Sequence, residues 1–177
     1  MERCGDNTDA RVGLAILYQQ WANSDEATPD IHAQLSYRIR QACEALQKEI
    51  GKGNKFKKLL DLADLYIETS DRIEAKEQLA LAESVCGGSR LKRAKIAERL
   101  GLICYRMEET AEAVKNYRQA LLANPQDLKL RANLGNALLQ LRQFTSAQEE
   151  FARVLKLAPG NIDALLGGRI LRIPCSP

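Results

Sequence analysis

The chain has few of the residues that catalytic and metal-binding domains carry. Its 177 residues include one histidine, His32, and five cysteines that form no Cys-x-x-Cys pair. We find no phosphate-binding glycine loop, no dinucleotide fingerprint and no metal-binding helix motif. No recognisable motif places a nucleophile or an acid around His32, which falls where a helix is expected to open. We therefore expect no enzyme activity, no catalytic residue, no cofactor and no metal ion.

Long apolar runs are also lacking. No uninterrupted apolar stretch approaches the ~18 residues that a membrane span needs. Residues 1–9 are polar and acidic, unlike the apolar centre of a secretory signal. The odd number of cysteines does not suit a disulfide framework, and Cys104 is best interpreted as a small buried hydrophobe. The sequence thus predicts a soluble, intracellular protein, assigned to the cytoplasm, with no membrane insertion.

Aromatic residues make up only 5% of the sequence, with three Phe and one Trp, whereas 45% of it is hydrophobic. Such a composition suits a core of Leu, Ala and Ile. Basic and acidic residues are nearly balanced, 26 against 23, for a formal net charge of +3. This balance neither requires nor excludes a nucleic-acid partner.

What the chain does have is one pattern that occurs twice, 34 residues apart. The first copy, counted from Ala94, contains Leu100, Gly101, Ala113, Tyr117, Ala120 and Pro125. The second copy, counted from Leu128, contains Leu134, Gly135, Ala147, Phe151, Val154 and Pro159. Self-similarity at a fixed period is typical of repeat architectures, in which each unit buries its apolar face against its neighbours.

The glycines of this pattern predict a close contact between two helices. Glycine inside a helix costs about 1 kcal/mol relative to alanine, so Gly101 and Gly135 indicate a neighbour that leaves no room for a side chain. We expect Ala113 and Ala147 to lie opposite them. The prolines end each unit, and Asp127 and Asn161 are expected to cap the following helices. Each unit is thus predicted to be a helical hairpin.

The spacing of a large residue, Leu-Gly, small Ala, an aromatic residue, Ala and Pro resembles the tetratricopeptide repeat family. The resemblance implies an all-α, right-handed superhelical solenoid of antiparallel helix hairpins, with about three clear repeats and irregular ends. The predicted divisions are an irregular N-terminal hairpin at 1–53, repeats at 56–89, 94–127 and 128–161, and a capping or truncated helix with a tail at 162–177. Four additional residues before the second repeat are expected to lie in a connector around Gly87 to Arg93.

The resemblance also implies a function, because the first helices of such hairpins line a concave groove. We expect a scaffold or adaptor that binds a peptide or helix of a partner protein, of the kind that assists complex assembly or chaperones, and no small-molecule substrate. The implied groove residues are Asp61, Asp64, Lys95, Arg99, Leu102, Tyr105, Arg106, Asn133, Asn136, Leu139 and Gln140.

The C-terminal segment departs from the pattern, because Gly168 and Arg169 stand where leucine and glycine belong. A capping helix should have a polar outer face, yet this one carries Leu165, Leu166 and Ile170. Three interpretations stay open: a cap, a partner-binding edge or a chain cut short. We expect self-association or a partner at this edge.

Two basic clusters leave an alternative function open. Lysines gather at 48–58, and lysines and arginines at 90–95, both at predicted joints between helices. Helical repeats can read RNA, and such clusters could contact phosphates. They lack interleaved aromatic residues apart from Phe56, and basic residues in loops are usually solvated surface. Protein binding is therefore the preferred interpretation.

Overall fold

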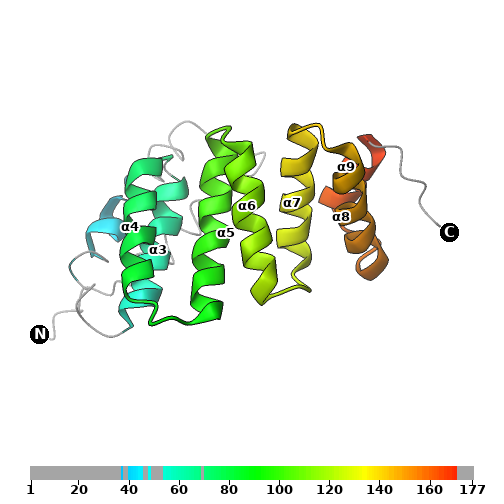
Figure 1. The fold of residues 1–177 in the computed structure, drawn as a ribbon. Helices are drawn as coiled ribbons and strands as arrows, with labels where there is room; N and C mark the ends of the chain where they lie inside the picture. Colours follow the sequence, from blue (N-terminus) through cyan, green and yellow to red (C-terminus); the bar gives the residue numbers. More distant parts are fainter. Residues whose placement is uncertain (1–36, 38–39, 46–47, 49–53, 69, 171–177) are drawn as a thin grey trace, which may run out of the picture. The chain divides into compact units, whose positions relative to one another are not determined.

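The described part of the chain is helical. The computed structural model describes residues 37, 40–45, 48, 54–68 and 70–170, with side chains as far as Arg169. Most of the predicted N-terminal hairpin at 1–53 lies outside these residues. Figure 1 labels α3 (Lys55–Glu68), α4 (Arg72–Ser84), α5 (Arg90–Arg106), α6 (Thr110–Ala123), α7 (Leu128–Gln140), α8 (Phe144–Leu157) and α9 (Ile162–Ile170). The described ranges contain no strand, and the predicted all-α repeat fold is confirmed.

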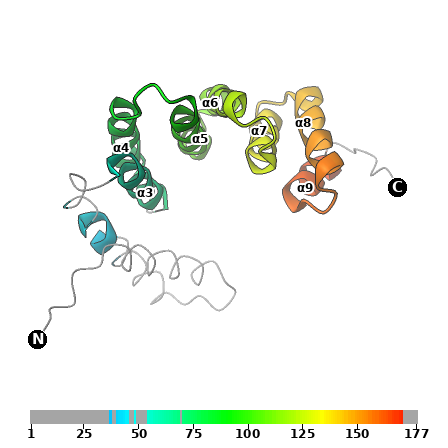
Figure 2. The same ribbon diagram turned by 90° about the horizontal axis from the view of Figure 1, so that it is seen from below.

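The chain divides into two compact units, residues 1–85 and 86–177, called here the first and the second unit. In the first unit α3 packs against α4. In the second unit each helix from α5 to α9 packs against the next, and α9 also contacts α7. Figure 2 shows α5, α7 and α9 along one side of this unit and α6 and α8 along the other. The first helices of successive hairpins therefore share one side of the second unit.

The turn inside each hairpin has the same backbone conformation three times. Its central residue has a positive φ: 64° at Ser70, 63° at Glu108 and 57° at Arg142. The residue after it donates its N–H to a carbonyl at 2.9 Å in all three, from Asp71 to Tyr66, Glu109 to Cys104 and Gln143 to Leu138. The hairpin at α3 and α4, whose sequence pattern is weaker, thus follows the same template as the other two.

We expect Glu108→Gly to stabilise the protein by up to ~1 kcal/mol. A left-handed conformation costs a residue with a Cβ roughly 1–2 kcal/mol, and glycine avoids this strain while losing more backbone entropy on folding. Urea unfolding followed by circular dichroism measures the difference. Glu108→Ala is the matched control, because it removes the carboxylate and keeps the Cβ. If Glu108→Ala stabilises as much as Glu108→Gly, the backbone strain is not the cause.

The first helices begin at side-chain caps. The Asp127 carboxylate accepts the N–H of Leu130 at 3.0 Å, and the Asn161 amide oxygen accepts that of Ala164 at 2.9 Å. Ser89 caps α5 in the same way through the Lys92 N–H at 3.4 Å. These bonds satisfy donors that an open helix end would leave unpaired. The predicted caps Asp127 and Asn161 are confirmed.

The pattern glycines lie directly beneath aromatic rings. A Cβ built on Gly101 would stand 2.6 Å from the Tyr117 ring, and one on Gly135 would stand 2.7 Å from the Phe151 ring. Both rings are almost fully buried. The prediction of a tight helix contact is therefore confirmed, but the predicted neighbours, Ala113 and Ala147, are not the closest ones. The space that each glycine leaves is filled by the aromatic ring of the same hairpin.

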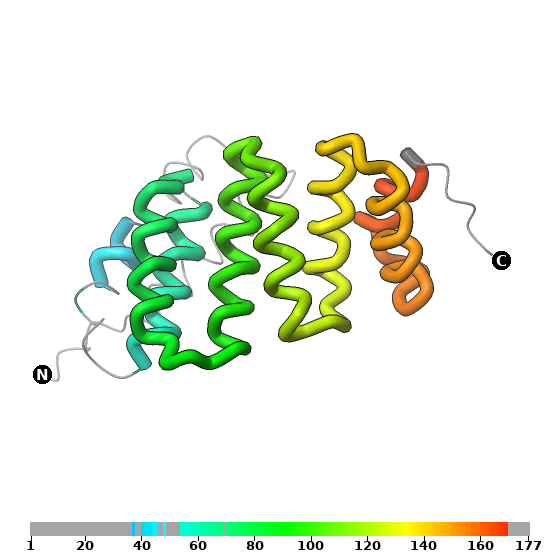
Figure 3. Tube along the Cα trace, in the orientation of Figure 1, coloured from blue at the N-terminus to red at the C-terminus, as the bar shows by residue number. Residues whose placement is uncertain are grey.

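The four additional residues before the second repeat form helix and not connector. α5 begins at Arg90 and has 17 residues, whereas the corresponding α7 has 13. In Figure 3 the tube of α5 is the longer of the two. The prediction of a connector reaching Arg93 was wrong. Ser89 caps α5 one turn earlier than the repeat pattern predicted. Gly87 and Gly88, which have positive φ, form the turn that precedes Ser89. α5 consequently exposes an additional N-terminal turn.

Candidate partner-binding face

The second unit holds nine of the predicted groove residues on two of its first helices. We call them the first-helix face: Lys95, Arg99, Leu102, Tyr105 and Arg106 on α5, and Asn133, Asn136, Leu139 and Gln140 on α7. All nine are exposed or half-buried, so each presents some surface to solvent. The other two predicted residues, Asp61 and Asp64, are half-buried on α3 of the first unit. The structure therefore defines a candidate face within the second unit alone.

Helical spacing explains why the α5 residues belong together. Lys95, Arg99, Leu102 and Arg106 follow one another at intervals of four, three and four, which places them in one stripe along the helix. Leu91 extends this stripe by one turn and is 58% exposed. Sequence analysis missed Leu91 because it took the helix to begin at Ala94. The cap at Ser89 was the signal that could have found it.

The stripe on α5 combines positive charge with an apolar centre. Lys95 and Arg106 are exposed, and Arg99 donates a hydrogen bond from Nη1 to the Lys95 carbonyl at 3.1 Å, which keeps its guanidinium close to the helix. Leu102 lies half-buried between these cations. Such a stripe can contact carboxylates of a partner while Leu102 takes an apolar side chain.

The α7 part of the face carries amides in place of charges. Asn133 and Asn136 are half-buried and Gln140 is exposed. Each amide offers two N–H donors and one carbonyl acceptor, a combination that matches the N–H and C=O groups of a peptide backbone. Tyr105 and Leu139 pack part of their surface against the hydrophobic core, and this packing holds their side chains in place. The face thus offers polar contacts around fixed apolar side chains.

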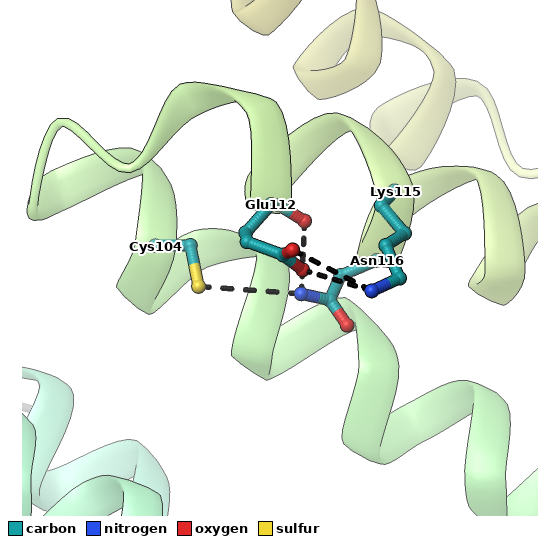
Figure 4. A network of polar contacts seen from close by, with 4 residues as sticks. All are labelled: Cys104, Glu112, Lys115 and Asn116. Carbon is teal, nitrogen blue, oxygen red and sulfur yellow. Dashed lines mark hydrogen bonds and ion pairs between the residues drawn. The ribbon is translucent and has the colours of Figure 1, made fainter.

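The polar contacts on the adjacent helix α6 are local. Figure 4 shows Lys115 with the Glu112 carboxylate at 3.3 Å, and the Asn116 amide donating to the Glu112 carbonyl at 2.9 Å. The Asn116 amide also lies 4.0 Å from the sulfur of Cys104, which is 5% exposed. Exposed pairs of this kind typically contribute ~0–1 kcal/mol. The predicted role of Cys104 as a small buried hydrophobe is confirmed.

Two buried ionisable groups, the Cys43 thiol in the first unit and the Tyr117 phenol in the second, are held in their neutral form. Burial raises the pKa of the Cys43 thiol to about 12, with the Asp71 carboxylate adding to the shift. Burial also raises the pKa of the Tyr117 phenol, with Tyr105 and Glu98 as further causes. A thiol that stays protonated at neutral pH is a poor nucleophile. These groups therefore serve packing.

Two arginines of the predicted basic joint at 90–95 donate hydrogen bonds to main-chain carbonyls within the second unit. Arg90 donates from Nη2 to the carbonyl of Leu122 at the end of α6, and Arg93 donates from Nη2 to the carbonyl of Gly88 at 2.7 Å. Both line a cavity of about 290 Å³ between α5 and α6. A cation near a helix C-terminus also complements the helix dipole. This joint therefore has a structural role in its own hairpin.

The paired helices, the shared side of first helices and the glycine-ring contacts define a helical-repeat protein. A family model described as tetratricopeptide repeat matches residues 105–167 of the chain. The resemblance inferred from the residues is confirmed. No curated protein matches the chain.

Solved structures with the same fold cover most of the chain. A tetratricopeptide repeat protein from Parabacteroides merdae has 17% identity and a TM-score of 0.67 over 93% of this chain and 59% of its own. MamA has 18% identity and a TM-score of 0.66 over 81% and 82%. YrrB, described as a TPR protein with an unusual peptide-binding site, has 19% identity and a TM-score of 0.62 over 89% and 82%. This chain thus spans about three fifths of the Parabacteroides protein.

Among the residues that the structure describes, no helix is both long and apolar enough to cross a membrane. Within the same residues, no group of three or more histidine, cysteine, aspartate or glutamate side chains is arranged to hold a metal ion.

Proposed function

We propose that this protein is a binding scaffold that holds a peptide or helix of a partner protein against the first-helix face of the second unit. The observation that supports this most is the composition of that face. It combines cations, amides and half-buried apolar side chains on two helices of one compact unit. The description of YrrB as a protein with a peptide-binding site agrees with this use of the fold.

The proposal includes a role without catalysis, as an adaptor in complex assembly or chaperone assistance in the cytoplasm. A repeat protein binds through an extended surface that several repeats build, so its function needs no enclosed pocket. The cations on α5 favour a partner segment with carboxylates, and the amides on α7 suit one whose backbone groups are accessible.

Binding of RNA is the less supported alternative. Nucleic-acid affinity depends on lysines and arginines that neutralise phosphates. Arg90 and Arg93 in the joint at 90–95 instead donate to main-chain carbonyls. In the joint at 48–58, Lys48, Lys55 and Lys57 are exposed, but they belong to the first unit and not to the candidate face.

Replacing both Asn133 and Asn136 with alanine should weaken partner capture by about fivefold or more and leave stability nearly unchanged. Loss of about two hydrogen bonds, each worth ~0.5–1.5 kcal/mol, corresponds to this factor. Changes at surface positions usually alter the free energy of unfolding by less than ~0.5 kcal/mol. The measurement is affinity capture from cell extract with the intact chain as bait, quantified by mass spectrometry, beside thermal unfolding.

The matched control is Gln119→Ala with Gln148→Ala, which removes two exposed amides from the second helices α6 and α8. Its captured proteins should be those of the unchanged chain. Equal capture by the asparagine variant and the control would contradict the proposed face. Capture of RNA that persists in both variants, with no protein lost, would support the alternative.

A further inference from the structure

The additional N-terminal turn of α5 exposes a leucine that the other first helices of the second unit do not match. Leu91 is 58% exposed. At the repeat distance of 34 residues its counterpart is Pro125, which lies before α7 begins at Leu128. The next counterpart is Pro159, which likewise precedes α9. α5 therefore carries one row of side chains more than α7 and α9.

Leu91 stands at one end of the stripe on α5. The stripe runs from Leu91 to Arg106, 15 residues further on and therefore about 22 Å along the helix axis. Its two apolar members, Leu91 and Leu102, lie 11 residues apart, about three turns. Cations occupy the positions between and beyond them, at Lys95, Arg99 and Arg106. A single exposed leucine is ordinary on a protein surface, whereas this one continues a row of candidate contacts.

The stripe is positive overall. Its three cations outnumber the one carboxylate beside it, that of the half-buried Glu98, by two charges. Such an excess attracts a segment that carries carboxylates, while the two leucines take apolar side chains. The stripe therefore fits a partner segment that is both acidic and amphipathic.

The predicted C-terminal edge on α9 offers no comparable stripe. Leu166 is 55% exposed and Leu165 is half-buried, while the side chain of Ile170 lies outside the described part. The exposed charges of this helix, Asp163 and Arg169, have opposite signs and so favour neither an acidic nor a basic partner. Self-association or a partner at this edge stays a prediction.

The leucine at the additional turn indicates the direction in which a partner lies. A segment that crosses from α5 to α7 can contact Leu102 and its counterpart Asn136, but it leaves Leu91 in water. A segment that runs along α5 covers Leu91 and Leu102 together. Covering both leucines favours the second arrangement, because each apolar side chain removed from water stabilises the complex.

The side chains of the stripe favour a helix over an extended chain. Lysine and arginine only donate hydrogen bonds and leucine forms none, so no member of the stripe accepts one from the N–H groups of an extended backbone. A helix pairs its own backbone groups. Its side chains also recur at intervals of three and four residues, which are the intervals of the stripe itself. Asn133 and Asn136 on α7 then contact polar side chains on the flank of that helix.

We propose that the partner segment is an acidic amphipathic helix of about four turns that lies along α5. Two of its apolar side chains cover Leu91 and Leu102, and its carboxylates lie opposite Lys95, Arg99 and Arg106. We rest this on the proposed function, because the helix would occupy the first-helix face. Leu91 is then a residue that determines which partners bind, since α7 has no helical residue in that row.

Photo-crosslinking from two positions of α5 tests the orientation of the partner. The full chain carries p-benzoylphenylalanine in place of Leu91 in one protein and of Leu102 in another, and both are illuminated in cell extract. Mass spectrometry identifies the crosslinked residues of the partner. Both positions should capture the same protein, at residues roughly 9 to 13 apart, because a partner helix has the same rise per residue as α5. The segment between them should carry carboxylates opposite Lys95 and Arg99.

Substitutions with matched controls test the two kinds of contact. Leu91→Ala should raise the protein concentration needed for half-maximal crosslinking at Leu102 about tenfold. Leu122→Ala, which removes a leucine that is 66% exposed on α6, should leave it unchanged. Lys95→Glu should have a similar effect to Leu91→Ala, because it places like charges opposite one another. Arg118→Glu, at an exposed position of α6, should have none. Far-ultraviolet circular dichroism should show the same helix content in every variant.

The possible failures separate the partner helix from the proposed function. A crosslink at Leu102 with none at Leu91 would overturn the helix along α5 and leave the first-helix face in place. So would crosslinked residues only about five apart, which is the spacing of an extended chain over the same length. Equal effects of each substitution and its control would overturn it as well. No crosslink at Leu102 would contradict the proposed function itself.

Discussion

Gly135→Leu should destabilise the second unit by at least ~3 kcal/mol, the upper part of the cost of overpacking a core. Even a Cβ at this position would lie 2.7 Å from a ring carbon of Phe151, and that ring is fully buried. The ring has little room to withdraw, because Gly167 of α9 also lies against it, at Cζ and Cε2. Urea unfolding followed by circular dichroism at 222 nm would show a lower midpoint or a separate early transition.

Gly160→Ala provides the control for this variant. A Cβ on Gly160 meets no atom within 4 Å, so its free energy of unfolding should change by less than ~0.5 kcal/mol. If Gly135→Leu unfolds at the same urea concentration as the unchanged chain, then α7 and α8 do not meet at the glycine and ring described here.

Phe151→Ala should destabilise the second unit by ~3–5 kcal/mol, the usual cost of deleting a buried aromatic side chain. Phe151 is fully buried and contacts glycines of two different helices, Gly135 of α7 and Gly167 of α9. Its removal leaves a cavity that three helices share. Because α9 packs mainly against α7 and α8, the variant should speed up the solvent exchange of the α9 amide protons more than that of the α5 amide protons.

Phe144→Ala is the matched control for Phe151→Ala. Phe144 lies on the same helix and is 51% exposed, so its removal should cost less than ~1 kcal/mol. Hydrogen exchange measured by mass spectrometry compares the two variants helix by helix. Similar losses of stability for both would contradict the assignment of Phe151 as the residue that joins α7, α8 and α9.

The repeat pattern predicted the hairpins because each recurring residue has a structural task. The glycine leaves space for the aromatic ring, and the proline ends the unit. The pattern could not tell which side chain fills the space above a glycine: the ring of Tyr117 does, where Ala113 was expected. A fixed 34-residue template also placed the start of α5 too late. The residues from Arg90 to Arg93 contain no helix breaker and follow a capping serine, so local helix rules predict the additional turn better than the template.

The sequence could predict which residues of one helix share a stripe of the candidate face, but not which helices contribute to that face. Spacing placed Arg99 and Leu102 on one stripe of α5, because helical geometry relates residues three and four positions apart. The combination with Asp61 and Asp64 depended on stacking all repeats alike, and these residues belong to a different compact unit. The side-chain chemistry favours carboxylates and backbone groups, which many protein segments offer, so it does not identify one partner.

Site-specific photo-crosslinking tests the proposed binding face most directly. Leu102 on the first-helix face and Leu122 on the second helix α6 would each be replaced with p-benzoylphenylalanine, and the two proteins illuminated in the same cell extract. Leu122 is the more exposed of the two, at 66% against a half-buried Leu102, so exposure alone favours crosslinks at Leu122. Our account predicts a discrete crosslinked protein at Leu102 that Asn133→Ala with Asn136→Ala abolishes, and none of that size at Leu122. The same crosslinked protein at Leu122, with none at Leu102, would contradict it.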